Sequence, residues 1–339
     1  MNGATDIELF STCPPAPALA DGGYLKQVIE VARWSERAGC RGILVYSDNS
    51  QLDPWLIAHL IVEHTASLCP LVAVQPVYMH PYTVAKAIAS IASLHGRRVY
   101  LNMVAGGFKN DLAALGDDTA HDRRYARLTE YTAIILQLLR GDGPVSHAGE
   151  FYKVENLRLS PACPAELLPG VFMSGSSEAG MAAARELGAT AIEYPKPVLD
   201  YTGQADGGLE SGIRIGIISR EQSEAAWEAA HTRFPEDRKG QITHQLAMRV
   251  SDSVWHKQLS GLAAQKGETP YWLVPFENYK TMCPYLVGSY REVGEELAGY
   301  IAHGYRTFIT DVPEVAEELD HIGQAFHNAI EQVNVAASP

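Results

Sequence analysis

Hydrophobic residues recur along the chain in two alternating patterns. Short runs rich in Val, Ile and Leu, typical of buried strands, alternate with longer stretches in which apolar residues repeat every three or four positions, as they do in amphipathic helices. This alternation is typical of a parallel sheet whose strands are joined by crossover helices. It predicts eight strands, at residues 7–12, 41–47, 70–76, 98–105, 170–174, 190–194, 213–219 and 306–310.

Two of the crossover helices are clear in the sequence. The first covers about residues 25–35, with Gly39 where the helix should end, and the second covers about 128–138, ahead of Gly141. Eight strands with helices between them predict an α/β fold of the (β/α)8 barrel (TIM barrel) class. The 339 residues show no convincing domain boundary, so one domain spanning residues 1–339 is expected.

Two segments exceed the minimal strand and helix repeat. Residues 145–159 alternate like a hairpin, and about 235–288 form a long connection between the seventh and eighth strands. Barrel active sites are built from loops at the carboxyl ends of the strands. The second insertion is therefore expected to be a substrate lid, and the alternative is a surface decoration.

Composition excludes several classes of function. A net charge of -13 without a run of Lys or Arg argues against a nucleic-acid partner. No apolar stretch reaches the length of a membrane span and the first residues lack signal-peptide features, so no membrane is expected and the predicted location is cytoplasmic. Five scattered cysteines without a Cys-x-x-Cys pair, and histidines without a His-Glu-x-x-His motif, predict neither disulfides nor a metal site.

The most informative local motif is Ser174-Gly175-Ser176-Ser177, where a predicted strand meets a helix at about 178–188. A glycine there lets a ligand approach the backbone, serines can donate hydrogen bonds, and the free N–H groups of a helix start favour phosphate. Serine is also the usual N-cap residue, so helix capping is the competing explanation.

Two further features gain weight from their position. His121 and Tyr125 lie at the start of the helix after the fourth strand, where both can face one ligand, although a solvated helix start explains them too. Asn102 is a polar residue inside a buried run and requires a hydrogen-bond partner, either in the barrel wall or on a ligand.

The ordered set of motifs resembles the luciferase-like flavin-dependent monooxygenases, nearest the alkanesulfonate monooxygenase branch. The motifs are the glycine-bounded run at 96–107, His121-Asp122-x-x-Tyr125, Gly149-Glu150-Phe151-Tyr152 and the serine–glycine junction at 174–177. The resemblance covers about residues 24–188 and resumes near Arg214, Gly288 and Phe308.

The resemblance implies a (β/α)8 barrel with FMN across its carboxyl-terminal mouth. The serine–glycine junction, with Ser176 and Ser177, would hold the phosphate, and His121 and Tyr125 would lie toward the ribityl-phosphate end. Asn102 and Ala105 would lie under the flavin ring, where the family often has threonine in place of Ala105.

Departures from the branch change the expected substrate. Gln51 stands in place of a cysteine and Gly216 in place of a histidine, and the tyrosine after the eighth strand has no counterpart, so desulfonation of simple alkanesulfonates is not expected. The remaining substrate-binding candidates are Gln51, Tyr194, Arg214 and Lys280. Arg214 could hold an anion or form a structural ion pair.

The expected activity is oxygenation of a small or medium organic substrate, including anionic or organosulfur compounds, with reduced FMN and O2. No Gly-x-Gly-x-x-Gly follows a strand, so a separate flavin reductase is the predicted partner. The family resemblance also implies that the protein forms a homodimer. Two alternatives remain: a deazaflavin-dependent oxidoreductase, and a non-catalytic flavin-binding subunit.

Overall fold

The architecture is a closed barrel of eight strands. The computed structural model describes residues 7–16, 22–106, 109–175, 177–201, 208–250, 254–262 and 269–336. The strand order around the barrel is β1-β13-β9-β8-β7-β4-β3-β2, and the first strand pairs in parallel with the last. The predicted (β/α)8 fold is confirmed. The barrel strands are β1 (Glu8–Thr12), β2 (Gly42–Val45), β3 (Cys69–Val74), β4 (Tyr100–Val104), β7 (Gly170–Ser174), β8 (Thr190–Glu193), β9 (Ser211–Arg214) and β13 (Thr307–Ile309).

Burial on both faces explains why these strands could be recognised in the sequence. Every residue of β2 and β3 is buried, and the two strands pair in parallel from Gly42 opposite Cys69 to Val45 opposite Val72. A strand covered on both sides reads as a continuous apolar run. The same reasoning holds for β4, whose buried residues include Asn102.

The prediction of the seventh strand was wrong in its second half. Residues 213–219 were expected to be one barrel strand, but the barrel strand ends at Arg214, and β10 (Gly216–Arg220) belongs to a separate sheet with order β10-β12-β11. The Ile215 N–H still donates to Ile309 of the barrel, whereas the Gly216 N–H donates to Pro284. A side chain at Gly216 would overlap the ring of Tyr285, so only glycine permits this close pairing.

The chain divides into two compact units. The N-terminal unit comprises residues 13–36 and 41–191, and the C-terminal unit comprises residues 1–12, 37–40 and 192–339. The single domain expected from the sequence stays a prediction. The helices of the N-terminal unit are α1 (Gly22–Arg37), α2 (Pro54–His64), α3 (Pro81–His95), α4 (Lys109–Ala114), α5 (His121–Arg140) and α6 (Glu178–Leu187).

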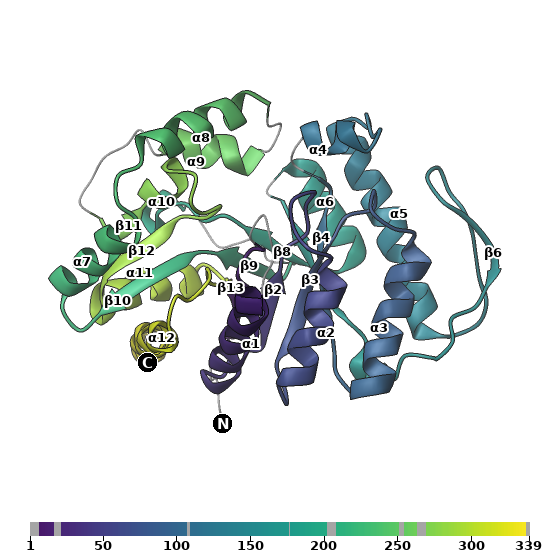
Figure 1. Cartoon of the computed structure of the whole chain (residues 1–339), viewed down its shortest axis with the longest axis horizontal. Helices are drawn as coiled ribbons and strands as arrows, with labels where there is room; N and C mark the ends of the chain where they lie inside the picture. Colours follow the sequence, from purple (N-terminus) through teal and green to yellow (C-terminus); the bar gives the residue numbers. More distant parts are fainter. Residues whose placement is uncertain are drawn as a thin grey trace. The chain divides into compact units, whose positions relative to one another are not determined.

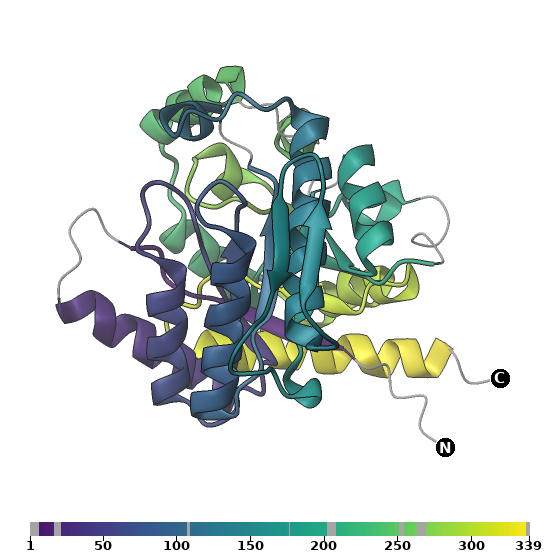
Figure 2. The same cartoon turned by 90° about the vertical axis from the view of Figure 1, so that its right-hand side faces the viewer.

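In the N-terminal unit, α3 packs against α5, and α5 against α6 (Figure 1). The two helices predicted from periodicity are α1 and α5, and α5 ends directly before Gly141. The predicted hairpin is also confirmed, because β5 (Val145–Ala148) and β6 (Lys153–Leu157) pair antiparallel and face the viewer in Figure 2. Glu130 of α5 holds the hairpin turn by accepting hydrogen bonds from the N–H groups of Phe151 and Tyr152.

In the C-terminal unit, the long segment predicted at 235–288 consists mainly of helices, and it ends within β12 (Tyr285–Ser289), which pairs in parallel with β10 outside the barrel. That this segment is an insertion and a substrate lid stays a prediction. The helix α11 packs against α12 and α7 against β12. The remaining elements of this unit are β11 (Tyr271–Trp272), α7 (Ser223–Arg233), α8 (Arg238–Val250), α9 (Val254–Leu262), α10 (Val274–Glu277), α11 (Tyr290–Ala302) and α12 (Ala316–Ala336).

Replacing Ser289 with alanine should lower the free energy of unfolding by about 1 kcal/mol. Ser289 is the N-cap of α11, and its hydroxyl accepts the Glu292 N–H while the Glu292 carboxylate accepts the Ser289 N–H at 2.7 Å. Threonine keeps the hydroxyl and should retain most of the stability. Urea unfolding of the two variants tests this, and equal midpoints would contradict it.

Candidate functional site

The cofactor-binding candidates of the N-terminal unit gather at the carboxyl ends of β4 and β7. Asn102 on β4 is buried, and the hydroxyl of Ser174, the last residue of β7, donates to its Oδ1 atom at 2.7 Å. The polar residue therefore has a partner in the barrel wall. This bond fixes the orientation of both side chains at the strand ends, where barrel enzymes bind ligands.

The β7–α6 junction has the close approach expected of a phosphate site. Gly175 has φ +147°, and a Cβ atom there would overlap the Tyr125 hydroxyl. Ser177 is the N-cap of α6, and its hydroxyl accepts the Gly180 N–H at 3.1 Å. The competing capping explanation thus applies to Ser177. Ser176 lies outside the described residues.

A phosphate group is compatible with this junction on two observations. The first turn of α6 starts three residues after Gly175, and the acidic residue of that turn, Glu178, is exposed to solvent. The first N–H groups of a helix are free to bind an anion. The serine–glycine junction can therefore hold the phosphate of a flavin nucleotide.

His121 and Tyr125 lie together in the first turn of α5. Their rings meet edge to face with centroids 5.3 Å apart, Tyr125 is buried, and His121 contacts Asp122 through its Nδ1 atom at 2.7 Å. Because Tyr125 also contacts Gly175, the pair belongs to the same cluster as the serine–glycine junction. Ala105 is buried just beyond β4 and offers only a methyl group.

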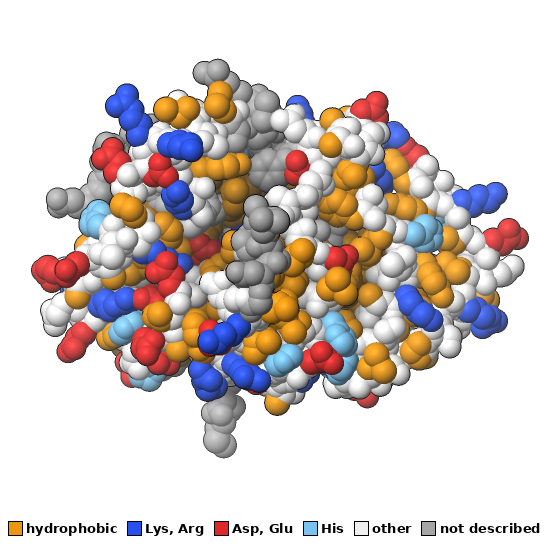
Figure 3. Space-filling view, viewed as in Figure 1, with side chains coloured by type: hydrophobic (Ala, Val, Ile, Leu, Met, Phe, Trp, Pro, Cys, Tyr) orange, Lys and Arg blue, Asp and Glu red, His pale blue; other side chains and the backbone are white. Residues whose placement is uncertain are grey.

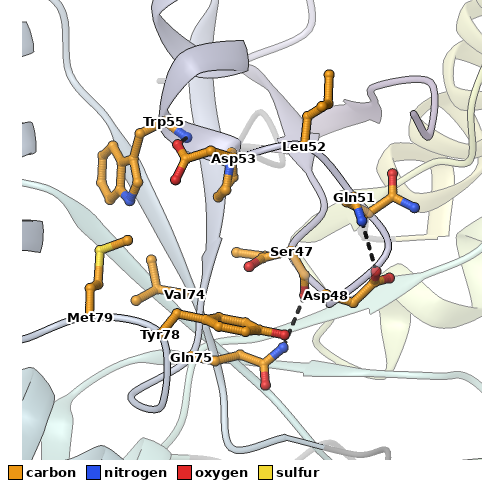
Figure 4. Close-up of a pocket in the computed structure, with 12 residues that line it drawn as sticks. Ser47, Asp48, Gln51, Leu52, Asp53, Trp55, Val74, Gln75, Tyr78 and Met79 are labelled. Atoms are coloured by element: carbon orange, nitrogen blue, oxygen red, sulfur yellow. Dashed lines mark hydrogen bonds between the residues drawn. The ribbon is translucent and has the colours of Figure 1, made fainter. Parts of the chain in front are cut away.

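A pocket of about 320 Å³ lies at the ends of β2 and β3 and the start of α2 (Figure 4). It contains Gln51, the predicted substrate-binding residue, whose Oε1 atom accepts the Ala16 N–H at 2.7 Å. Figure 4 shows Trp55 and Met79 on one side and Gln51 and Asp48 on the other. The pocket is lined by Ser47, Asp48, Gln51, Leu52, Asp53, Pro54, Trp55, Ala73, Val74, Gln75, Tyr78 and Met79.

The pocket is acidic and rich in hydrogen-bonding groups. None of its twelve described lining residues is Lys or Arg, whereas Asp48 and Asp53 both line it. Burial and then the nearby charge of Asp48 raise the pKa of Asp111, and burial with both carboxylates raises the pKa of Tyr78 to about 12. The buried Nε1 of Trp55 has no hydrogen-bond partner among the described residues. These features suit a ligand that is not an anion.

The C-terminal unit has its own cluster at strand ends. Arg214, the last residue of β9, hydrogen-bonds to Tyr194 just after β8 and lies 4.0 Å from the carboxylate of Asp311 just after β13. The Tyr285 hydroxyl donates to Asp311 at 2.7 Å, and burial raises the pKa of Tyr285 far above its usual value. Asp311 balances the charge of Arg214, which agrees with the ion-pair alternative. A substrate role for Tyr194 and Arg214 stays a prediction.

Lys280, the other predicted anion-binding residue, also has a carboxylate partner. Its Nζ atom lies 2.6 Å from Asp237, which precedes α8. Bonding to Lys280 lowers the pKa of Asp237. Both cations of the anion-binding hypothesis are therefore paired within the described chain.

Sequence reasoning missed several residues of these clusters. Gln75 directly follows the buried run of β3, and the argument applied to Asn102, a polar residue at the end of an apolar strand, would have identified it. Trp255 of α9 stacks on Tyr194 with ring centroids 3.9 Å apart at 16°. No motif indicated Trp255, because it lies in the long insertion.

Acidification should loosen the packing of α8 against α9. The Nε2 atoms of His244 and His256 lie 2.9 Å apart beside Phe276, a bond in which one neutral ring donates to the other. Burial, then the charge of His244, lowers the pKa of His256 from 6.5 to about 4. His256 therefore takes up a proton at higher pH when this segment is unfolded than when it is folded. The stability of the packed helices is fully present above pH 6.5 and decreases as the pH falls toward 4.

Amide-exchange protection factors of α8 and α9 at pH 7 and pH 5 measure this loss. A His256→Gln variant should show a smaller pH dependence, since its side chain does not titrate. Protection that is the same at both pH values in the unaltered protein would contradict the expectation.

The described residues have neither membrane-spanning nor metal-binding features. No helix among them is both long and apolar enough to cross a membrane. Nor do they contain a group of three or more His, Cys, Asp or Glu residues placed to hold a metal ion. The five cysteines are free and buried.

Comparison with known proteins identifies the family. Residues 6–307 match the luciferase-like monooxygenase family. The chain is 34% identical over 310 residues, 89% of this chain and 90% of the other, to BtrO of Niallia circulans, a 4-(gamma-L-glutamylamino)butanoyl-[BtrI acyl-carrier protein] monooxygenase.

Two solved structures share the fold at low sequence identity. They are the long-chain alkane monooxygenase LadA, with TM-score 0.72, 14% identity and coverage of 98% of this chain and 92% of the other, and the EDTA monooxygenase EmoA from Chelativorans sp. BNC1, with TM-score 0.70, 15% identity and coverage of 98% and 95%. The family match, the 34% identical relative and the closed barrel agree, and the chain belongs to the luciferase-like monooxygenase family.

Proposed function

We propose that the chain is a monooxygenase that uses reduced FMN, supplied by a separate flavin reductase, to oxygenate an organic acyl substrate carried on an acyl carrier protein. The observation that carries the flavin part is the cluster at the ends of β4 and β7. There, the Ser174 hydroxyl donates a hydrogen bond to Asn102, and Gly175, which precedes α6, lies against the Tyr125 hydroxyl of α5.

In this proposal the chain binds and orients the flavin nucleotide. The N–H groups at the start of α6, with Ser176 and Ser177, would hold its phosphate, and His121 with Tyr125 would lie along the ribityl chain. Asn102 and Ala105 would lie under the ring. Bound reduced FMN would supply the two electrons that activate O2. The protein's contribution would be to position the substrate and to limit the access of water.

The substrate part of the proposal rests on the relative and on charge. BtrO acts on an acyl-carrier-bound substrate and shares a third of its residues with this chain over most of both lengths. The pocket beside Gln51 has carboxylates and no Lys or Arg in its lining, and Arg214 and Lys280 are each paired with an aspartate. A sulfonate substrate is therefore not favoured, and a neutral or donor-rich acyl group is.

The deciding experiment mixes photoreduced FMN and protein with oxygenated buffer in a stopped-flow instrument. Reoxidation of the flavin should be slower than that of free FMN, because the bound flavin is held away from bulk solvent. Reoxidation at the rate of free FMN would contradict the proposal. Preferential binding of a reduced deazaflavin would favour the hydride-transfer alternative, and flavin retention without any oxygenation of a thioester substrate would favour the non-catalytic subunit.

A homodimer is part of the proposal. Leu56 of α2 and Leu94 of α3 are among the most exposed large apolar side chains described, and hydrophobic side chains gather on the surface over these helices (Figure 3). Exposed apolar patches commonly mark protein interfaces. Sedimentation of the unaltered protein and of a Leu56→Ser, Leu94→Ser variant tests this surface.

A further inference from the structure

The helices α8 and α9 present an apolar surface that nothing in the described chain covers. Ile242, Leu246 and Val254 are 53%, 55% and 43% exposed, although the same two helices bury His244 and His256 on their other side. Large apolar side chains exposed together on neighbouring helices mark a surface that binds a partner.

Helix geometry places basic side chains on the same surface. Arg238, Ile242 and Leu246 are four residues apart and share one side of α8, opposite the buried His244, with exposed Lys239 at the edge. On α9, Val254 and Lys257 are both exposed. Figure 3 shows hydrophobic and basic side chains together over α8.

The charge of this segment differs from that of the whole chain. Residues 238–262 contain four Lys and Arg residues (Arg238, Lys239, Arg249 and Lys257) and one acidic residue, Asp252, in a chain with a net charge of -13. An acidic partner would be repelled by most of the protein and attracted here. Such a charge contrast favours correctly oriented association with an acidic partner more than it raises the affinity of the complex.

The surface adjoins the strand ends of its own unit. Trp255, next to the exposed Val254, stacks on Tyr194, which directly follows β8 and hydrogen-bonds to Arg214 at the end of β9. A partner bound to α8 and α9 would therefore stand beside the carboxyl ends of two barrel strands, where barrel enzymes place their chemistry.

From these observations we infer that the exposed surface of α8 and α9 is the docking site for the acidic carrier protein that delivers the substrate. The inference rests on the proposed function. Acyl carrier proteins are small and acidic, and they carry the acyl group on a flexible arm, so a docking site needs cations, apolar contacts and nearness to the reacting centre. Nucleic acids expose charged phosphates and lack an apolar surface that would match Ile242 and Leu246.

The test measures binding of the holo BtrI acyl-carrier protein, fluorescently labelled, by anisotropy in the absence of flavin. A Lys239→Glu, Lys257→Glu variant should bind about tenfold more weakly at low ionic strength, with a smaller difference at high salt. An Ile242→Ser, Leu246→Ser variant should also weaken binding, and because both side chains are exposed it should fold normally. The matched control is Lys26→Glu, Lys153→Glu, which reverses two exposed charges of the N-terminal unit and should not change binding.

Absence of saturable binding by the unaltered chain, or equal binding by the charge-reversed and control variants, would overturn the inference. Flavin reoxidation measured on the same proteins separates it from the proposed function. If the unaltered protein slows flavin reoxidation but the charge-reversed variant binds the carrier normally, only the docking site is rejected. If reoxidation is as fast as that of free FMN but the charge-reversed variant loses carrier binding, the monooxygenase proposal is rejected and the docking site is retained.

Discussion

Replacing Asp311 with alanine should lower the free energy of unfolding by about 3 kcal/mol. Asp311 and Arg214 are 10% and 7% exposed in their side chains, and the Tyr285 hydroxyl also donates to Asp311. Removal of the carboxylate leaves a buried guanidinium without its counter-charge and a buried hydroxyl without its acceptor. Chemical denaturation measures the loss.

The chain offers a matched control for this prediction. Asp237 pairs with Lys280 at 2.6 Å, but their side chains are 27% and 49% exposed. Solvent screens such a pair, so Asp237→Ala should destabilise the fold much less than Asp311→Ala. A similar loss in both variants would mean that burial does not decide the contribution of Asp311.

Replacing Gly175 with alanine should weaken the binding of reduced FMN by at least about tenfold, a change of about 1.4 kcal/mol. The methyl group would overlap the Tyr125 hydroxyl, and the residue has φ +147°, which side chains rarely adopt. Either the junction or Tyr125 must move, and both belong to the proposed phosphate site. Equilibrium titration under anaerobic conditions measures the affinity.

The other end of the same helix provides the comparison. Gly188 also has a positive φ, +60°, but a Cβ atom there would meet nothing within 4 Å. Gly188→Ala should therefore cost about 1 kcal/mol of stability through backbone strain and leave flavin affinity unchanged. If both variants lost affinity equally, the effect would come from general destabilisation and not from the junction.

Features encoded by local pattern were predictable from the sequence. The barrel strands are buried on both faces, so β2, β3 and β4 appear as apolar runs, and the hairpin alternates as a two-sided ribbon should. Asn102 and Ser174 could be proposed because they are polar residues in or at the end of apolar strands, and Tyr125 because it lies with His121 at the start of the helix after the fourth strand.

Features that depend on distant partners could not be predicted. Apart from Arg214, residues 213–219 are all apolar or small, and the break between β9 and β10 depends on Tyr285, far along the chain. The pairing of Arg214 with Asp311 likewise joins residues from separate strands, so charge alone could not distinguish an anion site from an ion pair. The stacking of Trp255 on Tyr194 joins residues 61 positions apart, and no local pattern around Trp255 predicts it.

The departure of the chain from the barrel at Gly216 has a consequence for how this protein can be altered. β10 and β12 pair in parallel, with Gly216 opposite Tyr285 and Arg220 opposite Ser289, so the segment that contains α7 to α10 leaves β10 at one end of the strand pair and enters β12 at the other. Such a crossover needs a minimum length to return along the strands, but residues added beyond that length cost little entropy. The segment should therefore tolerate lengthening better than shortening.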